Sequence, residues 1–218
     1  MDSKDTSVVI CCAGMGSRLG IGTTKALIDV DGQPIIYRQL DLLQEFDDIR
    51  IVVGFQAERV IDTVNKYRND IVYAFNYDYE HTDIAESLEK GLLGVRENVL
   101  IMDGDVVICP EDFEKIAHWN GECICFCKPS SSEPVYAKVE NGNVTGFNTR
   151  NGEYEWCGIA KIRGNNLAMG KKYVYEMIAD SLPITGLEIR AKDIDTPEDY
   201  ENMLEWLHNG YTEKGVCE

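Results

Sequence analysis

The amino-acid sequence predicts an α/β fold in which helices cover both faces of a mainly parallel mixed sheet. Through the first 120 residues, short apolar runs rich in β-branched side chains alternate with segments of helical periodicity. Crossover connections of this length join parallel strands. After Gly121 the strands follow one another closely, which indicates antiparallel additions to the sheet.

The elements of the first half follow in order. The first strand is the apolar run that starts at Val8, and a glycine-rich turn ends it. Proline followed by two acids at Pro110 is typical of a helix start. The remaining predictions are strands at 49–54, 71–76 and 99–102, and helices at 57–67, 84–96 and from Pro110 onward.

The second half reads as short strands followed by two helices. Asn141-Gly142-Asn143 is a hairpin signal between two of the strands, and Thr196 begins a capping pattern. The predicted strands cover 122–128, 135–140, 144–147 and 153–162, and the helices cover 171–180 and 197 to about 208. Together the elements form a Rossmann-like three-layer α/β/α arrangement, with antiparallel additions in the C-terminal half of a single domain, 1–218.

Composition excludes several classes of partner. The formal net charge of −17 repels nucleic acid and anionic lipid, so we expect neither as a partner. No apolar run approaches the roughly 20 residues of a membrane span, and the N-terminus lacks the pattern of a secretory signal. The eight cysteines lack zinc-site spacing, and we interpret them as small buried residues of a reducing, cytoplasmic protein.

The turn after the first strand predicts a phosphate site. Glycines at 14 and 16 allow close backbone approach to a ligand, and Arg18 and Lys25 supply positive charge. A P-loop is excluded because Ala26 follows the lysine, and a dinucleotide fingerprint is disfavoured because Leu19 stands at its third glycine position.

This segment, from Cys12 to Gly20 with Lys25-Ala26-Leu27, resembles the signature of nucleoside triphosphate transferases. That group includes sugar-phosphate nucleotidylyltransferases, bacterial phosphocholine cytidylyltransferases and molybdenum-cofactor guanylyltransferases. The segment 31–36 is similar to the family's turn into its first long helix. The resemblance implies catalytic roles for Arg18 and Lys25, with nucleotide contacts from Ala13, Gly14, Met15, Gly16, Ser17 and Gly104. It divides the domain into a nucleotide-binding half, about 1–120, and an acceptor-binding half, about 121–218.

Two aspartates are candidates for a magnesium site. The strand before Asp103-Gly104-Asp105 ends in two acids, at the sheet edge where ligands of parallel sheets bind. In the resemblance, Asp105 and Asp195 match the family's two metal-binding aspartates, and Mg²⁺ prefers one or two carboxylates with phosphate oxygens and water. The alternative for Asp195 is membership in a plain helix-cap neighbourhood.

The remaining site predictions concern the base and the acceptor. Asn76, Thr82 and Ser87 are similar to the segment that cytidylyl relatives place near the pyrimidine, although Thr82 and Ser87 also suit capping and packing of the next helix. We expect the acceptor near Tyr136, Glu155, Trp156 and Lys161. Aromatic residues with acids nearby are typical of ammonium recognition, and equally of a small sheet's core.

These observations favour transfer of CMP from CTP to a small phosphorylated or phosphonate acceptor, with Mg²⁺ as cofactor and pyrophosphate as product. A phosphate monoester is largely dianionic at neutral pH, so no general base is required, and the three histidines show no catalytic arrangement. The alternatives are uridylyl or guanylyl transfer to a sugar 1-phosphate or a pterin, and a non-catalytic nucleotide-binding module. The antiparallel half is a candidate interface for a homodimer.

Overall fold

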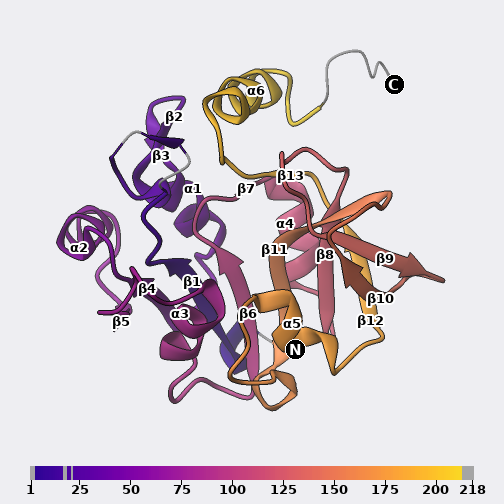
Figure 1. Ribbon diagram of the computed structural model, residues 1–218. Coiled ribbons are helices and arrows are strands. Elements are labelled where there is room, and N and C mark those ends of the chain that lie inside the picture. The colour runs from indigo at the N-terminus through magenta and orange to yellow at the C-terminus, as the bar shows by residue number, and fades with distance from the viewer. Residues whose placement is uncertain (1–2, 17–18, 21, 213–218) are drawn as a thin grey trace.

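A nine-stranded sheet runs through the centre of the computed structural model, which describes residues 3–16, 19–20 and 22–212 (Figure 1). Its strand order is β5-β4-β1-β6-β11-β8-β12-β10-β9. In chain order these strands are β1 (Thr6–Cys12), β4 (Ile49–Val53), β5 (Ile71–Phe75), β6 (Asn98–Asp103), β8 (Cys123–Cys127), β9 (Tyr136–Glu140), β10 (Asn143–Asn148), β11 (Tyr154–Arg163) and β12 (Ile184–Glu188).

The sheet has a parallel part and a mixed part. Strands β5, β4, β1 and β6 are parallel, whereas β11 pairs antiparallel with both β6 and β8. Strand β1 therefore lies between β4 and β6, and its carboxyl end meets that of β6. Two short ribbons lie outside the sheet: β2 (Asp29–Val30) with β3 (Gln33–Pro34), and β7 (Val107–Ile108) with β13 (Ala191–Lys192).

Helices cover both faces of the sheet, so the predicted three-layer fold is confirmed. Residues of α1 (Ile35–Leu42), α2 (Ala57–Asn65) and α4 (Pro110–Ala117) pack in one buried cluster with one face of the strands. Residues of α3 (Ile84–Gly91) and α5 (Val174–Ala179) pack in a second cluster with the opposite face. The last helix, α6 (Pro197–His208), packs in a separate cluster with the segment that leads into α1.

Most local predictions hold, with shorter elements than expected. Asn141 and Gly142 both have positive φ between β9 and β10, as a two-residue hairpin turn requires. Thr196 caps α6 and accepts a hydrogen bond from the Asp199 amide. The helix expected over 84–96 ends at Gly91, shortly before Gly94 takes a left-handed φ of 71°.

Strand β12 is the main element that the sequence did not predict. It runs parallel to β8 and contains Gly186, a residue type depleted in strands. The glycine is required here because a Cβ at position 186 would lie 2.7 Å from Cε1 of Phe126. The core therefore overrides a weak local strand signal.

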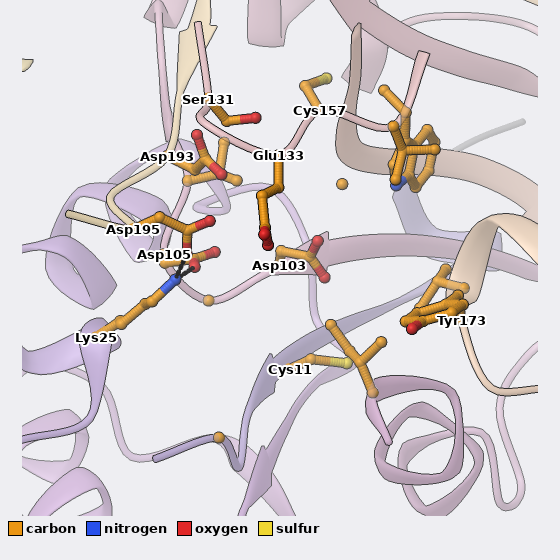
Figure 2. Close-up of a pocket in the computed structure, with 18 of the residues that line it drawn as sticks. Cys11, Lys25, Asp103, Asp105, Ser131, Glu133, Cys157, Tyr173, Asp193 and Asp195 are labelled. Atoms are coloured by element: carbon orange, nitrogen blue, oxygen red, sulfur yellow. Dashed lines mark hydrogen bonds and ion pairs between the residues drawn. The ribbon is translucent and has the colours of Figure 1, made fainter. Parts of the chain in front are cut away.

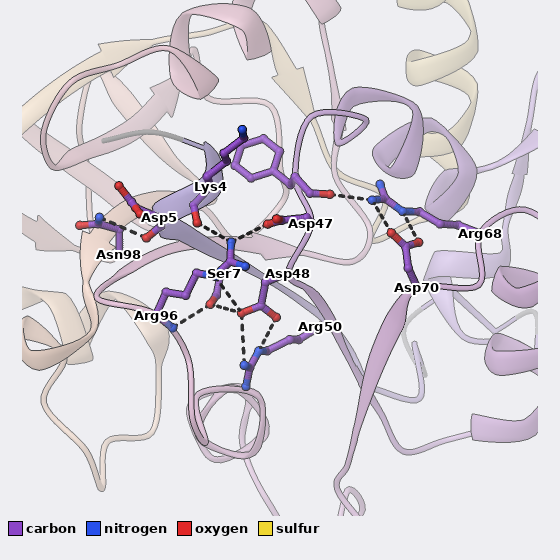
Figure 3. Close-up of polar contacts among 11 residues, drawn as sticks. Lys4, Asp5, Ser7, Asp47, Asp48, Arg50, Arg68, Asp70, Arg96 and Asn98 are labelled. Carbon is purple, nitrogen blue, oxygen red and sulfur yellow. Dashed lines mark hydrogen bonds and ion pairs between the residues drawn. The ribbon is translucent and has the colours of Figure 1, made fainter.

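The amino ends of the strands carry a polar network of their own (Figure 3). The carboxylate of Asp48 accepts hydrogen bonds from the Ser7 hydroxyl and from Nε of Arg50, at 3.0 Å for the latter. Burial raises the pKa of Asp48, but these contacts outweigh it and the pKa is lowered. In the part of the chain that the structure describes, no helix is long and apolar enough to cross a membrane.

Candidate nucleotidyl-transfer site

A cavity of about 1150 Å³ opens at the carboxyl ends of β1 and β6 (Figure 2). Its walls come from the turn after β1, the segment after β6, the first half of β11, and the loops around 130–136 and 191–195. Such an edge is where α/β sheets bind ligands. The cavity lining includes eight of the residues predicted to bind nucleotide or metal: Ala13, Gly14, Gly16, Thr82, Ser87, Gly104, Asp105 and Asp195.

Lys25 lies between the two predicted metal ligands. Its ammonium donates to Oδ2 of Asp105 at 2.7 Å and also to Oδ1 of Asp195. The loop that carries Lys25 returns to β1, where the buried Thr24 hydroxyl donates to the Cys12 carbonyl at 3.3 Å. Burial lowers the pKa of Lys25, but the two carboxylates outweigh it, so the pKa is raised and the side chain is charged.

Four aspartates surround this end of the cavity. Burial, followed by the charges of Asp105 and Asp193, raises the pKa of Asp103 well above its usual value. Burial and the charges of Asp105 and Asp195 raise the pKa of Asp193 to about 7. Oδ1 of Asp103 is buried and has no hydrogen-bond partner within the described ranges. This end of the cavity therefore gathers four carboxyl groups, two of which, Asp103 and Asp193, hold a proton more readily than an exposed aspartate, and the Lys25 ammonium lies at its edge.

The donor set fits magnesium. Asp105 and Asp195 contribute carboxylate oxygens that already share one cationic partner, and Mg²⁺ completes such a pair with water and phosphate oxygens. In the described ranges no group of three or more His, Cys, Asp or Glu side chains is arranged as a metal cage. A site that relies on its substrate for further ligands needs no such cage.

Asn76 lies behind the cavity wall. It is buried at the end of β5, and its side-chain amide donates to the hydroxyls of Thr82 at 2.7 Å and Ser87 at 2.9 Å. Thr82 and Ser87 themselves line the cavity, and Asp83 is the N-cap of α3. The three predicted residues therefore form one cluster, in which Asn76 orients the two hydroxyls.

The structure brings three of the four residues predicted for the acceptor site to the cavity. Tyr136, Glu155 and Trp156 line the cavity. The carboxylate of Glu155 accepts from the Ser130 and Ser131 amides, at 2.8 Å and 3.3 Å, and from the Ser131 hydroxyl. Glu155 therefore orders the serine loop that forms one wall of the cavity.

Lys161 is not brought to the cavity, contrary to its predicted position in the acceptor site. The side chain is fully buried, and its ammonium donates to the carbonyls of Ala117 at 3.0 Å and Trp119 at 3.1 Å. Cavity lining from β11 ends at Gly158, so Lys161 lies roughly 10 Å farther along the strand, beneath the end of α4. Its contacts are those of a structural residue that binds a helix C-terminus.

The glycine-rich turn is described in part. Gly16 has a φ of 59°, and a Cβ there would lie 3.0 Å from Cγ of Lys25. Met15 is 39% exposed and is not among the lining residues. Ser17 and Arg18 lie outside the described residues, so their predicted roles stay predictions.

Further polar residues line the cavity without having been predicted, among them Ser131, Glu133 and Asp193. Glu133 extends toward Asp103 and Asp105, and Ser131 and Asp193 lie at the rim of the cavity (Figure 2). The alternating acids at 193 and 195 were a usable signal for Asp193. Glu133 lies in the serine- and proline-rich stretch 129–134, which has the composition of a connecting loop and gives no sign of its contacts.

Comparison with known proteins assigns the family. A family model described as "MobA-like NTP transferase domain" matches residues 8–142. The chain belongs to this family. The matched residues include the turn after β1, Lys25 and Asp105, and also the loop around 130–136 that forms another wall of the cavity.

Curated relatives of this NTP transferase chain are distant. It is 30% identical over 142 residues to the bifunctional protein GlmU of Aliarcobacter butzleri, covering 63% of this chain and 32% of that protein. It is 28% identical over 149 residues to 2-C-methyl-D-erythritol 4-phosphate cytidylyltransferase of Clostridium kluyveri, covering 62% of each. The chain spans about a third or less of the length of the GlmU proteins that it matches.

Solved structures confirm the Rossmann-like fold. The CTP:phosphocholine cytidylyltransferase of Streptococcus pneumoniae superimposes with a TM-score of 0.77 at 19% identity, covering 93% of this chain and 99% of that one. The inositol-1-phosphate CTP transferase of T. maritima gives a TM-score of 0.79 at 14% identity, covering 99% of each chain. At these identities the likeness concerns the fold.

Proposed function

We propose that this chain is a Mg²⁺-dependent cytidylyltransferase, which transfers CMP from CTP to a small phosphorylated or phosphonate acceptor and releases pyrophosphate. The observation that carries the proposal is the meeting of Lys25, Asp105 and Asp195 at the carboxyl end of the sheet, beside the glycine-rich turn. Three residues so far apart in sequence converge where an α/β sheet binds its ligand.

The reaction follows from the charges of this site. An oxygen of the acceptor attacks the α-phosphorus, a new O–P bond forms, and the bond to the bridging oxygen of the β-phosphate breaks. The barrier lies in joining two anions, so positioning and positive charge are the required contributions. Lys25 supplies one charge at the α-phosphate, and Arg18 supplies another at the leaving pyrophosphate. Mg²⁺, when bound by Asp105 and Asp195, supplies charge neutralisation between the acceptor and the α-phosphate.

The choice of cytosine is supported by the polar wall opposite this cluster. The hydroxyls of Thr82 and Ser87 are oriented by Asn76 and lie at the cavity surface. The Thr82 hydroxyl itself donates to the Asp78 carbonyl at 2.9 Å, so the Ser87 hydroxyl is the one of this pair that can donate to the carbonyl oxygen or ring nitrogen of a pyrimidine edge. Two of the similar proteins are also described as using CTP, the phosphocholine and inositol-1-phosphate transferases.

The acceptor side supports a substrate that carries a positive group beside its phosphate. Glu133, Asp103 and Asp193 line this part of the cavity, and Asp103 has an oxygen without a partner in the described part of the chain. Trp156 and Tyr136 offer aromatic faces. Besides Lys25, the described residues that line the cavity include two further cations, Arg150 and Lys192.

Pyrophosphate release with each of the four nucleoside triphosphates and a panel of acceptors tests the proposal. The panel contains aminoalkyl phosphates and phosphonates, sugar 1-phosphates and phosphate alone, with Mg²⁺ and with EDTA. We expect turnover with CTP, with an aminoalkyl acceptor, and only in the presence of the metal. Turnover with UTP or GTP and a sugar phosphate would replace the substrate assignment, and no pyrophosphate from any pair would contradict the transferase proposal.

A further inference from the structure

A buried carboxylate outside the cavity is bound to the segment that carries Asp195. The side chain of Asp112, in the first turn of α4, is 4% exposed. Its Oδ2 accepts from the backbone amide of Arg190 at 2.9 Å and from Nε of Arg190 at 2.8 Å. Burial raises the pKa of Asp112, but the hydrogen bonds from Arg190 and Lys115 outweigh it and lower the pKa to about 2. The contact is therefore an ion pair throughout the neutral range.

Arg190 stands at the start of the short ribbon that joins the two metal-ligand segments. The ribbon has two residue pairs, Ala191 with Ile108 and Lys192 with Val107. Asp105 precedes one strand of the ribbon by two residues, and Asp195 follows the other by three. The distance between these carboxylates therefore depends on a ribbon of two residue pairs, a length that is marginal on its own.

The ion pair closes the end of this ribbon that is remote from the cavity. The Cys109 amide donates to the Arg190 carbonyl at 2.9 Å, and Nη2 of Arg190 reaches Glu111 at 2.9 Å. At the other end, the Asp195 amide donates to Oδ2 of Asp199, within the cap of α6. The segment from 190 to 195 thus has one anchor on α4 and one on α6.

We propose that Asp112 and Arg190 are positioning residues that fix Asp195 relative to Asp105 and so set the affinity of the site for its divalent cation. The proposal rests on the proposed metal role of those two aspartates. Neither member of the ion pair lines the cavity, so both act through the ribbon. Loss of residues that orient metal ligands typically costs about 10-fold to 100-fold in metal affinity or activity.

The test compares Mn²⁺ binding by electron paramagnetic resonance with the dependence of turnover on Mg²⁺. In Asp112→Asn we expect Mn²⁺ to bind at least about 10-fold more weakly and the apparent KM for Mg²⁺ to rise equally. We expect KM for CTP and kcat at saturating Mg²⁺ to change by less than about threefold. Arg190 is 39% exposed at its side chain, so Arg190→Gln is a milder second variant with the same expected result.

Asp48→Asn is the matched control. Asp48 is also a nearly buried, arginine-paired carboxylate, 13% exposed, but it lies at the amino ends of the strands (Figure 3). We expect it to lower the melting temperature without changing Mn²⁺ affinity. Unchanged Mn²⁺ affinity in both Asp112→Asn and Arg190→Gln would overturn the positioning role alone. A wild-type protein that binds no Mn²⁺ would overturn the metal site and this inference together.

Discussion

The ammonium of Lys25 lies where a cation shared by Asp105 and Asp195 would bind, so Lys25 and a metal ion compete for the same carboxylate oxygens. Lys25→Met retains most of the stem and removes the charge. We expect kcat to fall at least about 100-fold, as for loss of one transition-state donor. We also expect Mn²⁺ to bind more tightly without nucleotide, measured by electron paramagnetic resonance. Lys128→Met, at an exposed ion pair with Glu153, is the control, and unchanged turnover in Lys25→Met would contradict the catalytic role.

Gly158 shows how one missing side chain shapes the cavity. It has a φ of 74°, and a Cβ there would lie 2.2 Å from Oδ2 of Asp103. Gly158→Ala therefore forces the backbone or Asp103 to move, and we expect about 2 kcal/mol of lost stability and reduced kcat. Gly164→Ala is the control, since its Cβ would meet only ordinary contacts beginning at 3.6 Å. Urea unfolding measures the stability of the two variants, and pyrophosphate release measures their kcat. Equal stability of Gly158→Ala and Gly164→Ala would refute the steric argument.

At the scale of elements, α6 couples a helix cap to a metal ligand. Oδ2 of Asp199 accepts from the amides of Asp195 and Thr196, and the Thr196 hydroxyl accepts from the Asp199 amide at 3.2 Å. Thr196→Ala removes part of this cap, and we expect it to lower the free energy of unfolding by about 1 kcal/mol. Thermal unfolding checks this against Thr212→Ala, an exposed threonine near the end of the described chain. A melting temperature equal to wild type would show that the cap carries no stability.

Sequence patterns predicted those elements whose local signals agree with their packing. Periodicity identified the parallel strands and their crossover helices, and the hairpin at Asn141 follows from turn chemistry alone. Strand β12 was missed because it contains Gly186, a residue type that weakens the local strand signal. The reason for a glycine there, the space that the Phe126 ring occupies, becomes visible only in the folded core. Ribbon β7–β13 is too short to leave a periodic signal, although it joins the two ends of the site.

The site itself was predictable where function constrains residue type within a short segment. Lys25, Asp105 and Asp195 carry recognisable neighbours in sequence, and the fold brings them together. Glu133 could not be predicted, because its contact with the cavity depends on how the serine loop folds over β11. Lys161 was misassigned because strand membership does not tell how far along the strand the cavity extends.

At the scale of the whole molecule, the net charge of −17 affects how substrate arrives. A CTP anion approaching this surface is repelled over a Debye length of about 30 Å at 0.01 M salt but only about 8 Å at 0.15 M. We expect KM for CTP to fall as KCl rises across this range, with kcat nearly constant, in initial-rate assays at fixed free Mg²⁺. A KM that rises steadily with salt would show that local cations dominate the encounter.

The homodimer expected from the sequence stays a prediction.

The burial of Lys161 has a consequence for chemical labelling. Its ammonium is fully enclosed and bound to the carbonyls that end α4, whereas the Lys128 and Lys138 side chains are each more than 60% exposed. An amine-directed acylating reagent therefore modifies the surface lysines of the native protein while Lys161 reacts only when α4 separates from the sheet. The fraction of Lys161 acylated over time thus reports the opening of this part of the core under native conditions, and no residue has to be substituted to measure it.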